Sequence, residues 1–463
     1  MDTKALRQKI LDLAIHGKLV PQDPNDEPAS VLLERIRAEK ERLIKEGKIK
    51  KGKKSAKTSD KPHYPFELPK GWVWCKLDDI VVFQGGYAYK SNTYVNQSMW
   101  QVIRIGNVKN DSLNLKIQPV FVDEKTGKET QKYQLHKDDI LFTMTGTKGK
   151  RDYFYSVKVQ TIEKKLLLNQ RVGCLRLFTP YINVDFLCLS LKCQYILDAI
   201  FSTETGNVSQ GNIGSESTLN LKIAIPPFAE QCRIVTEVNK WYMAIEQLEQ
   251  EKDKLQSSID QVKSKVLDLA IHGKLVPQDP NDEPASELLK RINPKAEITC
   301  DTPQYGKLPK GWCETTLGNT IVIKSGDAIK VRDNRIGKYP IYGGNGITGY
   351  NESYNVDGIN IIIGRVGFYC GSVHYVNNKI WVTDNAFVTK IMGNVYTPKF
   401  LYYLLQQYDL KQYSNSTAQP VISGKTVYPI NVMLPPLSEQ YRIVARIEEL
   451  FAQLDKIESS LQA

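Results

Sequence analysis

LDLAIHGKLVPQDPNDEPAS, at residues 11–30, is repeated without a change at residues 267–286. An exact internal repeat indicates a chain built from similar parts. Two further motifs are duplicated: LPKGW at 68–72 and 308–312, and a proline-pair motif, IPPFAEQCRIV at 225–235 and LPPLSEQYRIV at 434–444. Each half therefore reads LPKGW, a long variable region, the proline pair, a helix and the LDLAIHGKLVPQDP segment. The second half obtains its last segment from the start of the chain.

A heptad pattern follows the first proline pair. From Ile234 to Leu269 apolar residues alternate in steps of four and three, with a polar interruption at Lys252, which is typical of a coiled-coil seam. The pattern returns at 443–461, and Leu6, Ile10 and Leu13 continue it at the N-terminus. We predict two antiparallel helices, one central and one split between the chain ends, each about 36 residues and roughly 54 Å long. An ordinary amphipathic helix packed on its own domain is the alternative.

The two variable regions share an order of elements but few letters. Each begins with LPKGW and continues with a β-like run, a glycine-rich turn, two further strand regions, a helix-like run and a polar loop. The predicted fold class is α+β, with two globular mixed α/β domains separated by two long antiparallel coiled-coil helices in a circular pseudo-two-fold repeat. The predicted segments are a helical 1–36, a basic linker 37–67, a first variable domain 68–225, a central helix and linker 226–292, a second variable domain 308–434 and a C-terminal helix 435–463.

The amino-acid composition indicates which kind of partner and which cellular compartment to expect. The net charge is +11, and residues 37–61 hold eleven Lys or Arg against four Asp or Glu. We interpret this stretch as a solvated linker, with nucleic-acid binding as the competing interpretation. The positive balance suits a polyanionic partner. The eight cysteines form no Cys-x-x-Cys pair, and no apolar run reaches the roughly 18 residues that would span a bilayer. We expect a cytoplasmic protein without a membrane segment.

Motifs for catalysis are missing from the sequence. The glycine-rich stretches match neither phosphate-binding pattern, and the five histidines form no metal-binding pattern. The proline pairs resemble those of amino-methylating enzymes, but Ile225 and Leu434 stand where such enzymes carry Asn or Asp. His16 and His272 are repeat equivalents near predicted helix ends, so we assign them a structural role. We predict no catalytic site and no metal site in this chain.

With these motifs and YGGNGITGY at 342–350, the chain resembles the specificity subunit of type I restriction-modification enzymes over essentially its full length. The resemblance implies that each variable region is a target recognition domain that reads one half of an asymmetric, bipartite site in double-stranded DNA. It implies helices that set the spacing between the halves. Its implied partners are two modification subunits, which bind S-adenosylmethionine and methylate adenine, and restriction or motor subunits that use ATP with Mg. This chain itself would hold no cofactor and would serve antiviral defence by choosing the sequence.

Polar loops at matching places in both variable regions supply candidate DNA contacts. Amide and guanidinium groups can read base edges, and lysines can neutralise phosphates. In the first region the candidates are Gln84, Tyr87, Lys90, Arg104, Asn107, Lys148, Lys150, Arg151, Gln210 and Asn212. In the second they are Lys324, Lys330, Arg332, Tyr342, Asn345, Arg365, Gln419 and Lys425.

Two other functions remain open at this point. A structural coiled-coil adaptor could bind proteins through its end domains. A self-sufficient DNA methyltransferase or nuclease would need a cofactor motif that the sequence does not contain.

Overall fold

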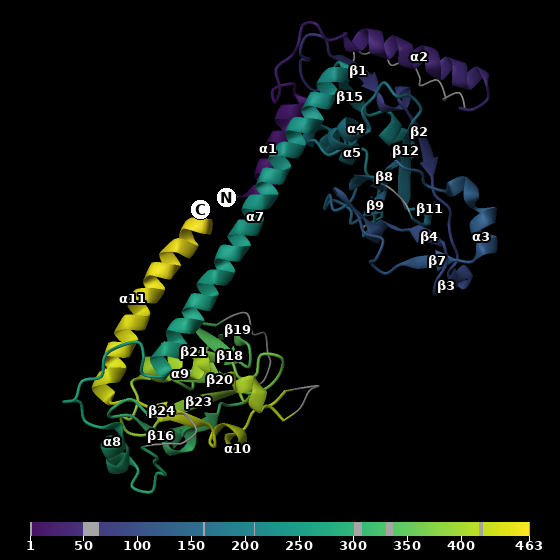
Figure 1. The fold of residues 1–463 in the computed structure, drawn as a ribbon. Helices are drawn as coiled ribbons and strands as arrows, with labels where there is room; N and C mark the ends of the chain where they lie inside the picture. The colour runs from purple at the N-terminus through teal and green to yellow at the C-terminus, as the bar shows by residue number, and fades with distance from the viewer. Residues whose placement is uncertain are drawn as a thin grey trace. The chain divides into compact units, whose positions relative to one another are not determined.

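The computed structural model describes residues 2–49, 64–160, 163–207, 209–300, 308–329, 337–415 and 420–462 (Figure 1). Its contacts divide the chain into an N-terminal unit, Asp2–Gln250, and a C-terminal unit, Glu251–Ala463. The helix α7 (Phe228–Ile271) contributes its first part to one unit and its last part to the other. Within the described residues, no helix has both the length and the apolar character that a membrane crossing requires.

The N-terminal unit combines helices with short strands. Its helices besides α7 are α1 (Thr3–Ile15), α2 (Ala29–Lys45), α3 (Glu124–Glu129), α4 (Val184–Ser190), α5 (Gln194–Phe201) and α6 (Ser215–Leu219). Its strands are β1 (Val73–Lys76), β2 (Val81–Gly85), β3 (Tyr94–Val95), β4 (Trp100–Ile103), β5 (Val108–Lys109), β6 (Ser112–Leu113), β7 (Val120–Val122), β8 (Ile140–Thr143), β9 (Thr145–Gly146), β10 (Ser156–Lys158), β11 (Lys165–Leu168), β12 (Val172–Leu177), β13 (Thr205–Gly206), β14 (Gly211–Asn212) and β15 (Lys222–Ile225).

The C-terminal unit has the same kinds of element. Its helices besides α7 are α8 (Ala285–Ile292), α9 (Pro398–Gln407), α10 (Gly424–Val427) and α11 (Leu437–Gln462). Its strands are β16 (Cys313–Thr316), β17 (Ile321–Ser325), β18 (Tyr339–Gly343), β19 (Gly346–Asn351), β20 (Ile359–Gly364), β21 (Val373–Asn377), β22 (Trp381–Val382), β23 (Ala386–Ile391) and β24 (Asn431–Leu434).

The two units repeat one sheet topology. The main sheet of the N-terminal unit has the antiparallel order β10-β8-β12-β2, and that of the C-terminal unit has the order β21-β20-β23-β17. In both units a two-stranded ladder joins the strand after LPKGW to the strand before the proline pair, β1 to β15 and β16 to β24. A parallel pair is also common to both, β4 with β11 and β18 with β22. The predicted shared frame of the two variable regions is therefore confirmed.

Each part of α7 has an antiparallel partner helix within its own unit. The Arg7 guanidinium of α1 binds the Glu249 carboxylate at 3.0 Å. The equivalent pair in the C-terminal unit is Lys263 of α7 with Glu458 of α11, also at 3.0 Å. The apolar side of α1 and the first part of α7 share a buried core with α2, α4 and α5, in which Ile234 is fully buried. Helix pairing and the mixed α/β domains were both predicted.

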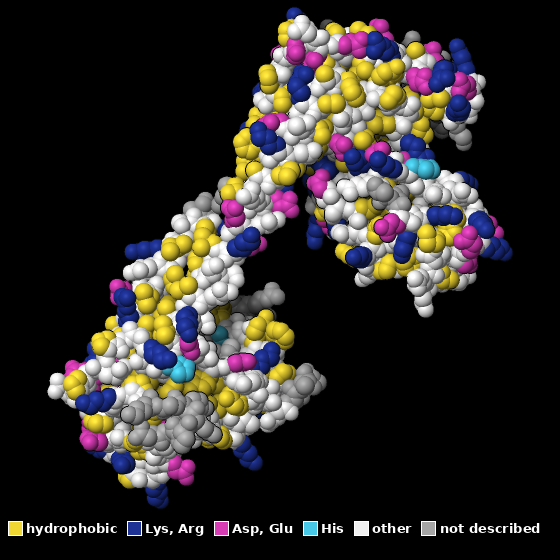
Figure 2. Space-filling model, in the orientation of Figure 1, with side chains coloured by type: hydrophobic (Ala, Val, Ile, Leu, Met, Phe, Trp, Pro, Cys, Tyr) yellow, Lys and Arg dark blue, Asp and Glu magenta, His cyan; other side chains and the backbone are white. Residues whose placement is uncertain are grey.

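The predicted seam of α7 is only half buried in this chain. Val238, Ile245, Ile259 and Val266 occupy one set of seam positions at seven-residue spacing and are buried. The other set begins with the buried Ile234 and continues with Trp241, Leu248, Leu255 and Val262, which are 40–48% exposed. Apolar side chains are visible along the long helices in Figure 2. The heptad pattern therefore predicted the helix pairing, but it did not show that these four side chains remain exposed.

The three duplicated motifs meet at one place in each unit. In the N-terminal unit the buried Glu230 carboxylate accepts hydrogen bonds from Trp72 Nε1 at 3.0 Å and from Gln22 Nε2 at 3.1 Å. These residues come from the proline-pair motif, from LPKGW and from the repeated segment. In the C-terminal unit Trp312 and Gln278 bind Glu439 at the same two distances. The three motifs are duplicated together because their side chains bond to one another in each unit.

A second ion pair fixes the same contact in both units. Arg233 binds Asp26 at 2.5 Å in the N-terminal unit, and Arg442 binds Asp282 at 2.7 Å in the C-terminal unit. Both arginines belong to the proline-pair motif, three residues after its glutamate. Both aspartates lie in the PQDPND part of the repeated segment. The copy of this segment that packs in each unit is the one that precedes LPKGW in the chain.

Two glycines end the repeated helices and explain their spacing from LPKGW. Gly17 and Gly273 have φ values of +66° and +65°, which are strained for a residue with a Cβ atom. A Cβ on Gly17 would lie 2.4 Å from Pro69 Cγ, and one on Gly273 would lie 2.5 Å from Pro309 Cγ. The helix end therefore lies directly against the LPKGW proline. The Nδ1 atoms of His16 and His272 are each hydrogen-bonded to a carbonyl oxygen of the preceding helical turn. These bonds agree with the structural role that we assigned to the two histidines.

Helix α2 reaches into the segment that we predicted to be a linker. It continues to Lys45, whereas the basic linker was predicted to start at residue 37. Arg42 bonds to Glu39 and Glu46 along the helix, and Lys40 binds Asp78 of the variable domain at 3.0 Å. The pairs of Arg42 with Glu39 (i,i+3) and with Glu46 (i,i+4) stabilise the helix. Composition alone had suggested that this stretch would be a solvated linker. Residues 50–61 of the Lys-rich stretch lie outside the described residues.

Candidate nucleic-acid interface

In the main sheet of each unit, several loops lie together at one end of the strands. In the N-terminal unit β2 and β8 both run antiparallel to β12, which lies between them. The ends of β2 and β8 therefore lie beside the start of β12. The same holds for β17, β20 and β23 in the C-terminal unit. We call this part of each unit the loop edge, made of residues 86–90, 144–155, 169–171 and 210–212 in the N-terminal unit and 326–329, 342–345, 365–372, 383–385 and 420–425 in the C-terminal unit.

Backbone hydrogen bonds hold the loops of the N-terminal edge together. The Tyr87 N–H donates to the Leu168 carbonyl at 2.9 Å, and the Met144 N–H donates to the Arg171 carbonyl at 3.0 Å. The Ile213 N–H donates to the Met144 carbonyl at 2.9 Å. Four loops that are distant in sequence are thus bonded to one another. The separate sequence motifs did not reveal this proximity.

The C-terminal edge is bonded in the same pattern. The Arg365 N–H donates to the Asn385 carbonyl at 2.9 Å, and the Ile422 N–H donates to the Arg365 carbonyl at 3.0 Å. Arg365 therefore occupies the place of Met144, and Asn385 the place of Arg171. The two edges share a backbone frame but present different side chains at equivalent positions.

A glycine allows the closest approach of two loops at each edge. A Cβ on Gly86 would lie 2.1 Å from the Asn169 carbonyl oxygen, and one on Gly326 would lie 2.2 Å from the Val382 carbonyl oxygen. No side chain fits at either position without moving the backbone. The glycine after the first sheet strand, which both variable regions share, is therefore required by packing.

Five of the predicted contacts of the N-terminal unit lie on two bonded loops. Lys148 Nζ donates to the Gly206 carbonyl at 3.0 Å, and Gln210 Nε2 donates to Asn212 Oδ1 at 3.2 Å. Arg151 forms an exposed ion pair with Asp198 at 2.6 Å. Lys150, between Lys148 and Arg151, is exposed. Polar and cationic groups from both loops are therefore available at one surface.

The other predicted contacts of this unit are divided. Tyr87 is 41% exposed and Lys90 is exposed, whereas Gln84 Nε2 donates to the Lys132 carbonyl at 2.8 Å. Arg104 Nη2 donates to the Gln118 carbonyl at 2.8 Å beside the edge. Asn107 is 2% exposed, and its amide donates to two carbonyls of its own loop. A buried amide with these partners cannot reach a base, so we leave Asn107 out of the interface.

In the C-terminal unit Arg365 is the most firmly placed candidate. Its Nη1 donates to Ser325 Oγ at 3.1 Å and to the Asp384 carbonyl at 3.2 Å, and its guanidinium carbon lies 5.5 Å from the Phe387 ring centroid. These contacts hold the group at the edge in a fixed orientation. A fixed guanidinium can present its remaining donors to a planar acceptor pair at low entropic cost.

The remaining candidates of this unit surround Arg365 in the fold. Asn345 and Lys425 are exposed on the edge, and Lys324 is exposed near the end of β17. Tyr342 is half-buried against His374, with ring centroids 5.9 Å apart, and burial raises its pKa. The predicted residues Lys330, Arg332 and Gln419 lie outside the described part of the chain.

The structure adds residues that sequence patterns missed. Arg171 is exposed at the start of β12, beside the loops of the N-terminal edge. Phe368 and Tyr369 are 73% and 51% exposed in the loop that follows Arg365, and Lys411 Nζ lies 4.2 Å from the Phe368 ring centroid. The antiparallel order of the strands was the missing signal. It would have assigned each of these loops to the edge.

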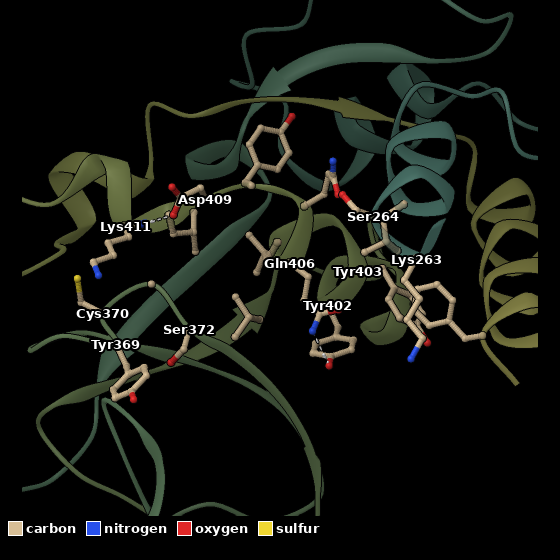
Figure 3. A pocket seen from close by; sticks show the side chains of 18 of the residues that line it. Lys263, Ser264, Tyr369, Cys370, Ser372, Tyr402, Tyr403, Gln406, Asp409 and Lys411 are labelled. Carbon is tan, nitrogen blue, oxygen red and sulfur yellow. Dashed lines mark hydrogen bonds between the residues drawn. The ribbon is translucent and has the colours of Figure 1, made fainter. Parts of the chain in front are cut away.

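A groove lies beside this aromatic loop. It has a volume of about 860 Å3 and is bordered by α7, α9, α11 and residues 368–373. Figure 3 shows Tyr369 and Lys411 on one side of it and Lys263 and Tyr403 on the other. The groove combines apolar and polar side chains and lies entirely within the C-terminal unit.

Catalytic and metal chemistry finds no support in the described residues. No group of three or more His, Cys, Asp or Glu side chains among them could hold a metal ion. Burial raises the pKa of the thiols of Cys75, Cys188 and Cys193, which leaves them protonated and unreactive at neutral pH.

The comparisons with known proteins agree on one family. Residues 69–257 and 309–463 match the family model of the type I restriction modification DNA specificity domain. The chain is 29% identical to the type I restriction enzyme EcoAI specificity subunit of Escherichia coli, over 98% of this chain and 90% of that one. It is 27% identical to the EcoEI specificity subunit of Escherichia coli, over 99% of this chain and 91% of that one. A solved chain of a type I R-M system has a similar fold, with a TM-score of 0.60 and 16% identity over 86% of this chain and 94% of that chain.

Proposed function

Since the chain belongs to the family of type I restriction-modification DNA specificity subunits, we propose how its two target recognition domains divide the selection of a DNA site. The chain is the non-catalytic specificity component of such a system. Each loop edge would bind one half of a bipartite site in double-stranded DNA. The observation that carries this proposal is the shared backbone frame of the two edges with different side chains at equivalent positions, Met144 against Arg365.

The chemistry of each edge fits a division of labour between phosphates and bases. The exposed lysines, among them Lys90, Lys148, Lys150 and Lys425, can bind phosphates and give salt-dependent affinity. Amide and guanidinium groups, such as those of Gln210, Asn212 and Arg365, can form paired hydrogen bonds with base edges, each worth about 1–3 kcal/mol of discrimination. Because the two edges differ, the two half-sites would differ in sequence.

The helix α7 would set the spacing of the half-sites. Its 44 residues have a length of about 66 Å at 1.5 Å per residue. Half-sites on one face of DNA lie about one helical turn, roughly 34–36 Å, apart. We propose that α11 and α1 continue one another as the second, split helix, so that a rod of two helices links the domains.

The partners would dock on what the two units have in common. The exposed stripe of Trp241, Leu248, Leu255 and Val262 is apolar and runs along α7. An apolar stripe of this kind on a helix is typical of a protein interface. We propose that two modification subunits cover it, bringing S-adenosylmethionine, and that restriction or motor subunits bring ATP with Mg. The complex would act on DNA in the cytoplasm.

Mapping of methylated adenines in host DNA, with and without the gene for this chain, tests the proposal. We expect one bipartite motif that disappears when the gene is removed. Footprinting of the purified complex should then protect two patches. Protection of neither patch at low salt would favour a coiled-coil adaptor instead, and methyl transfer by the purified chain alone would favour a self-sufficient enzyme.

A heptad insertion tests the ruler separately. The bonds of α7 to α1 reach Glu249, and those to α11 begin at Gln256. Seven residues inserted between Lys252 and Asp253 would leave both sets of bonds in place and lengthen α7 by about 10 Å. We expect the same two half-sites with a longer preferred spacer. An insertion variant that folds and retains the original spacer contradicts the ruler role.

A further inference from the structure

The loop between β20 and β21 presents two large aromatic side chains to solvent. Phe368 is 73% exposed and Tyr369 is 51% exposed. Their rings are perpendicular, with centroids 5.0 Å apart. Exposed apolar area of this size is unfavourable in water and therefore calls for a partner.

The loop that carries the pair is firmly held. The Gly371 N–H donates to the Gly364 carbonyl at 2.7 Å, and the Gly364 N–H donates to the Ser372 carbonyl at 2.8 Å. The Gly367 N–H donates to the Pro420 carbonyl at 2.9 Å. Gly367 and Gly371, which flank the tip, have φ values of +96° and +87°. The backbone is thus fixed in a conformation that directs the tip outward, so the exposure of the rings is built into the fold.

Cationic side chains accompany the pair. Lys411 Nζ lies 4.2 Å from the centroid of the Phe368 ring, and Figure 3 shows Lys411 on the same side of the groove as Tyr369. The fixed guanidinium of Arg365 lies three residues before Phe368 on the same loop. Aromatic rings beside cations are typical of surfaces that bind nucleic acid through stacking and phosphate contacts together.

The equivalent loop of the N-terminal unit is built in the opposite way. It joins β8 to β10, the strands that match β20 and β21, and it also carries an aromatic pair, Tyr153 and Phe154. Both rings are only 2% exposed, because the backbone turns them inward with a φ of +62° at Phe154. Lys148, Lys150 and Arg151 face solvent instead. The same loop is therefore basic at its tip in one unit and aromatic in the other.

This difference decides between two kinds of partner. Two copies of one protein partner would use features that both units share, such as the helices and the duplicated motifs. The aromatic tip occurs in one unit only, so it matches what differs between the half-sites, which is the DNA sequence. We propose that Phe368 and Tyr369 form a wedge that inserts between two base pairs of the half-site bound by the C-terminal unit. This inference rests on the proposed function and deepens it.

A wedge of this kind selects sequence through deformability. Partly unstacking a base step costs least at flexible pyrimidine–purine steps such as TA and CA. The half-site of the C-terminal unit should therefore contain such a step, next to a base that Arg365 reads. The half-site of the N-terminal unit should lack this requirement, since its tip offers cations and no exposed aromatic pair.

Fluorescence of 2-aminopurine placed at successive positions of the mapped site tests the wedge. The complex of this chain with its modification subunits is mixed with duplexes that each carry one substitution. We expect increased fluorescence at one step in one half-site, and loss of that signal in the Phe368→Ala, Tyr369→Ala double variant. Affinity for the cognate duplex should fall about 10- to 100-fold. The methylated adenines, where the modification subunit extrudes its own target base, serve as internal controls whose signal the double variant retains.

Ile359→Ala is the matched control. Ile359 is 50% exposed on β20 but lies at the other end of that strand, away from the loop edge. Its variant should retain both the affinity and the fluorescence change. Folding of all variants is checked by circular dichroism. If the double variant proves unstable, the two single alanine variants are compared with Phe368→Tyr, which retains a ring and should retain the fluorescence signal that the alanine variants weaken.

Three results would overturn the inference. Wild-type complex that binds the bipartite site without any fluorescence change outside the methylated adenines excludes a wedge but leaves the proposed function intact. A double variant that fails to assemble with the modification subunits, while its affinity for DNA is unchanged, assigns the pair to a protein interface. Wild-type complex that binds no bipartite site overturns this inference and the proposed function together.

Discussion

The two units agree in their helical contacts and differ at their loop edges. Arg7–Glu249 corresponds to Lys263–Glu458, and the Trp72–Glu230 bond corresponds to Trp312–Glu439. At the edges, by contrast, equivalent backbone positions carry unrelated side chains. The comparison separates two tasks within one fold. The duplicated contacts maintain the frame, and the side chains that differ are the ones that can select two different half-sites.

Adding a methyl group at the duplicated glycines should have the largest effect. Gly17→Ala and Gly273→Ala would each force a Cβ into the adjacent LPKGW proline at a positive φ. The conformational penalty of about 1–2 kcal/mol and an overpacking cost of about 1–3 kcal/mol add to a loss of roughly 2–5 kcal/mol in the free energy of unfolding. Urea unfolding measures this loss, which should be similar in the two variants because the two environments match.

Gly47→Ala is the control for these variants. Gly47 has a φ of +71°, but among the described residues no atom beyond its chain neighbours lies within 4 Å of the added Cβ. Only the conformational penalty of about 1–2 kcal/mol should remain. A loss at Gly17 or Gly273 no larger than that at Gly47 would show that the LPKGW contact is not tight. Clearly unequal losses at Gly17 and Gly273 would break the equivalence of the two units.

Making the two edges alike at one position should have the next largest effect. Arg365→Met gives the C-terminal unit the residue that its equivalent position, Met144, carries. We expect the free energy of binding to the cognate site to weaken by about 1–3 kcal/mol, or roughly 5- to 150-fold in affinity, because a fixed guanidinium is lost from the edge. Binding titrations measure it, and Met144→Ala is the control. Unchanged affinity of the Arg365→Met complex would remove Arg365 from the interface.

The comparison of the units also shows how far the sequence could be interpreted. Exact repeats predicted the two units and their shared order of strands, because duplicated motifs must meet duplicated partners. Heptad spacing predicted the long helices but not their exposed side, since period alone does not say how much of a seam a short partner covers. Trp241 and Val262 satisfy the seam pattern and are nevertheless exposed.

The candidate interface was less predictable than the fold. Exposed lysines and amides in glycine-rich loops were found from composition, as at Lys148 and Lys425. Asn107 has the same chemistry but is buried by bonds within its own loop. The inward or outward direction of an aromatic pair depends on local backbone angles, as at Phe154 against Phe368. Such angles are set by tertiary bonds that no residue pattern expresses.

Removal of one exposed lysine should have a smaller effect than the change at Arg365. Lys148→Ala removes a cation from the N-terminal edge, where its ammonium bonds only to the Gly206 carbonyl among the contacts of the described chain. A phosphate contact contributes without regard to sequence, so we expect uniformly weaker binding to cognate and altered sites. The slope of log affinity against log salt should decrease in magnitude by about 1. A change in sequence preference instead would assign Lys148 to base recognition.

The smallest effect expected is the pH dependence of the duplicated contact. Burial raises the pKa of Glu230 and of Glu439 above their ordinary value of 4.5, although the bonds from Gln22 and Trp72, or from Gln278 and Trp312, oppose the shift. A carboxyl group with a raised pKa in the folded state stabilises the fold at pH values below 4.5. This contribution decreases as the pH rises from 4.5 through the raised pKa and is then absent.

Glutamine variants isolate this contribution from the other carboxylates. Glu230→Gln and Glu439→Gln remove the titration while retaining the shape of the side chain. The free energy of unfolding of the wild type minus that of either variant should therefore fall as the pH rises above 4.5 and then become constant, by the same amount in both units. Urea unfolding at a series of pH values measures it. A difference that instead increases as the pH rises toward 4.5 and is constant above it would mean that the two hydrogen-bond donors outweigh burial and stabilise a buried carboxylate anion. A decrease in one unit alone would mean that the duplicated contact is equivalent in geometry but not in electrostatics.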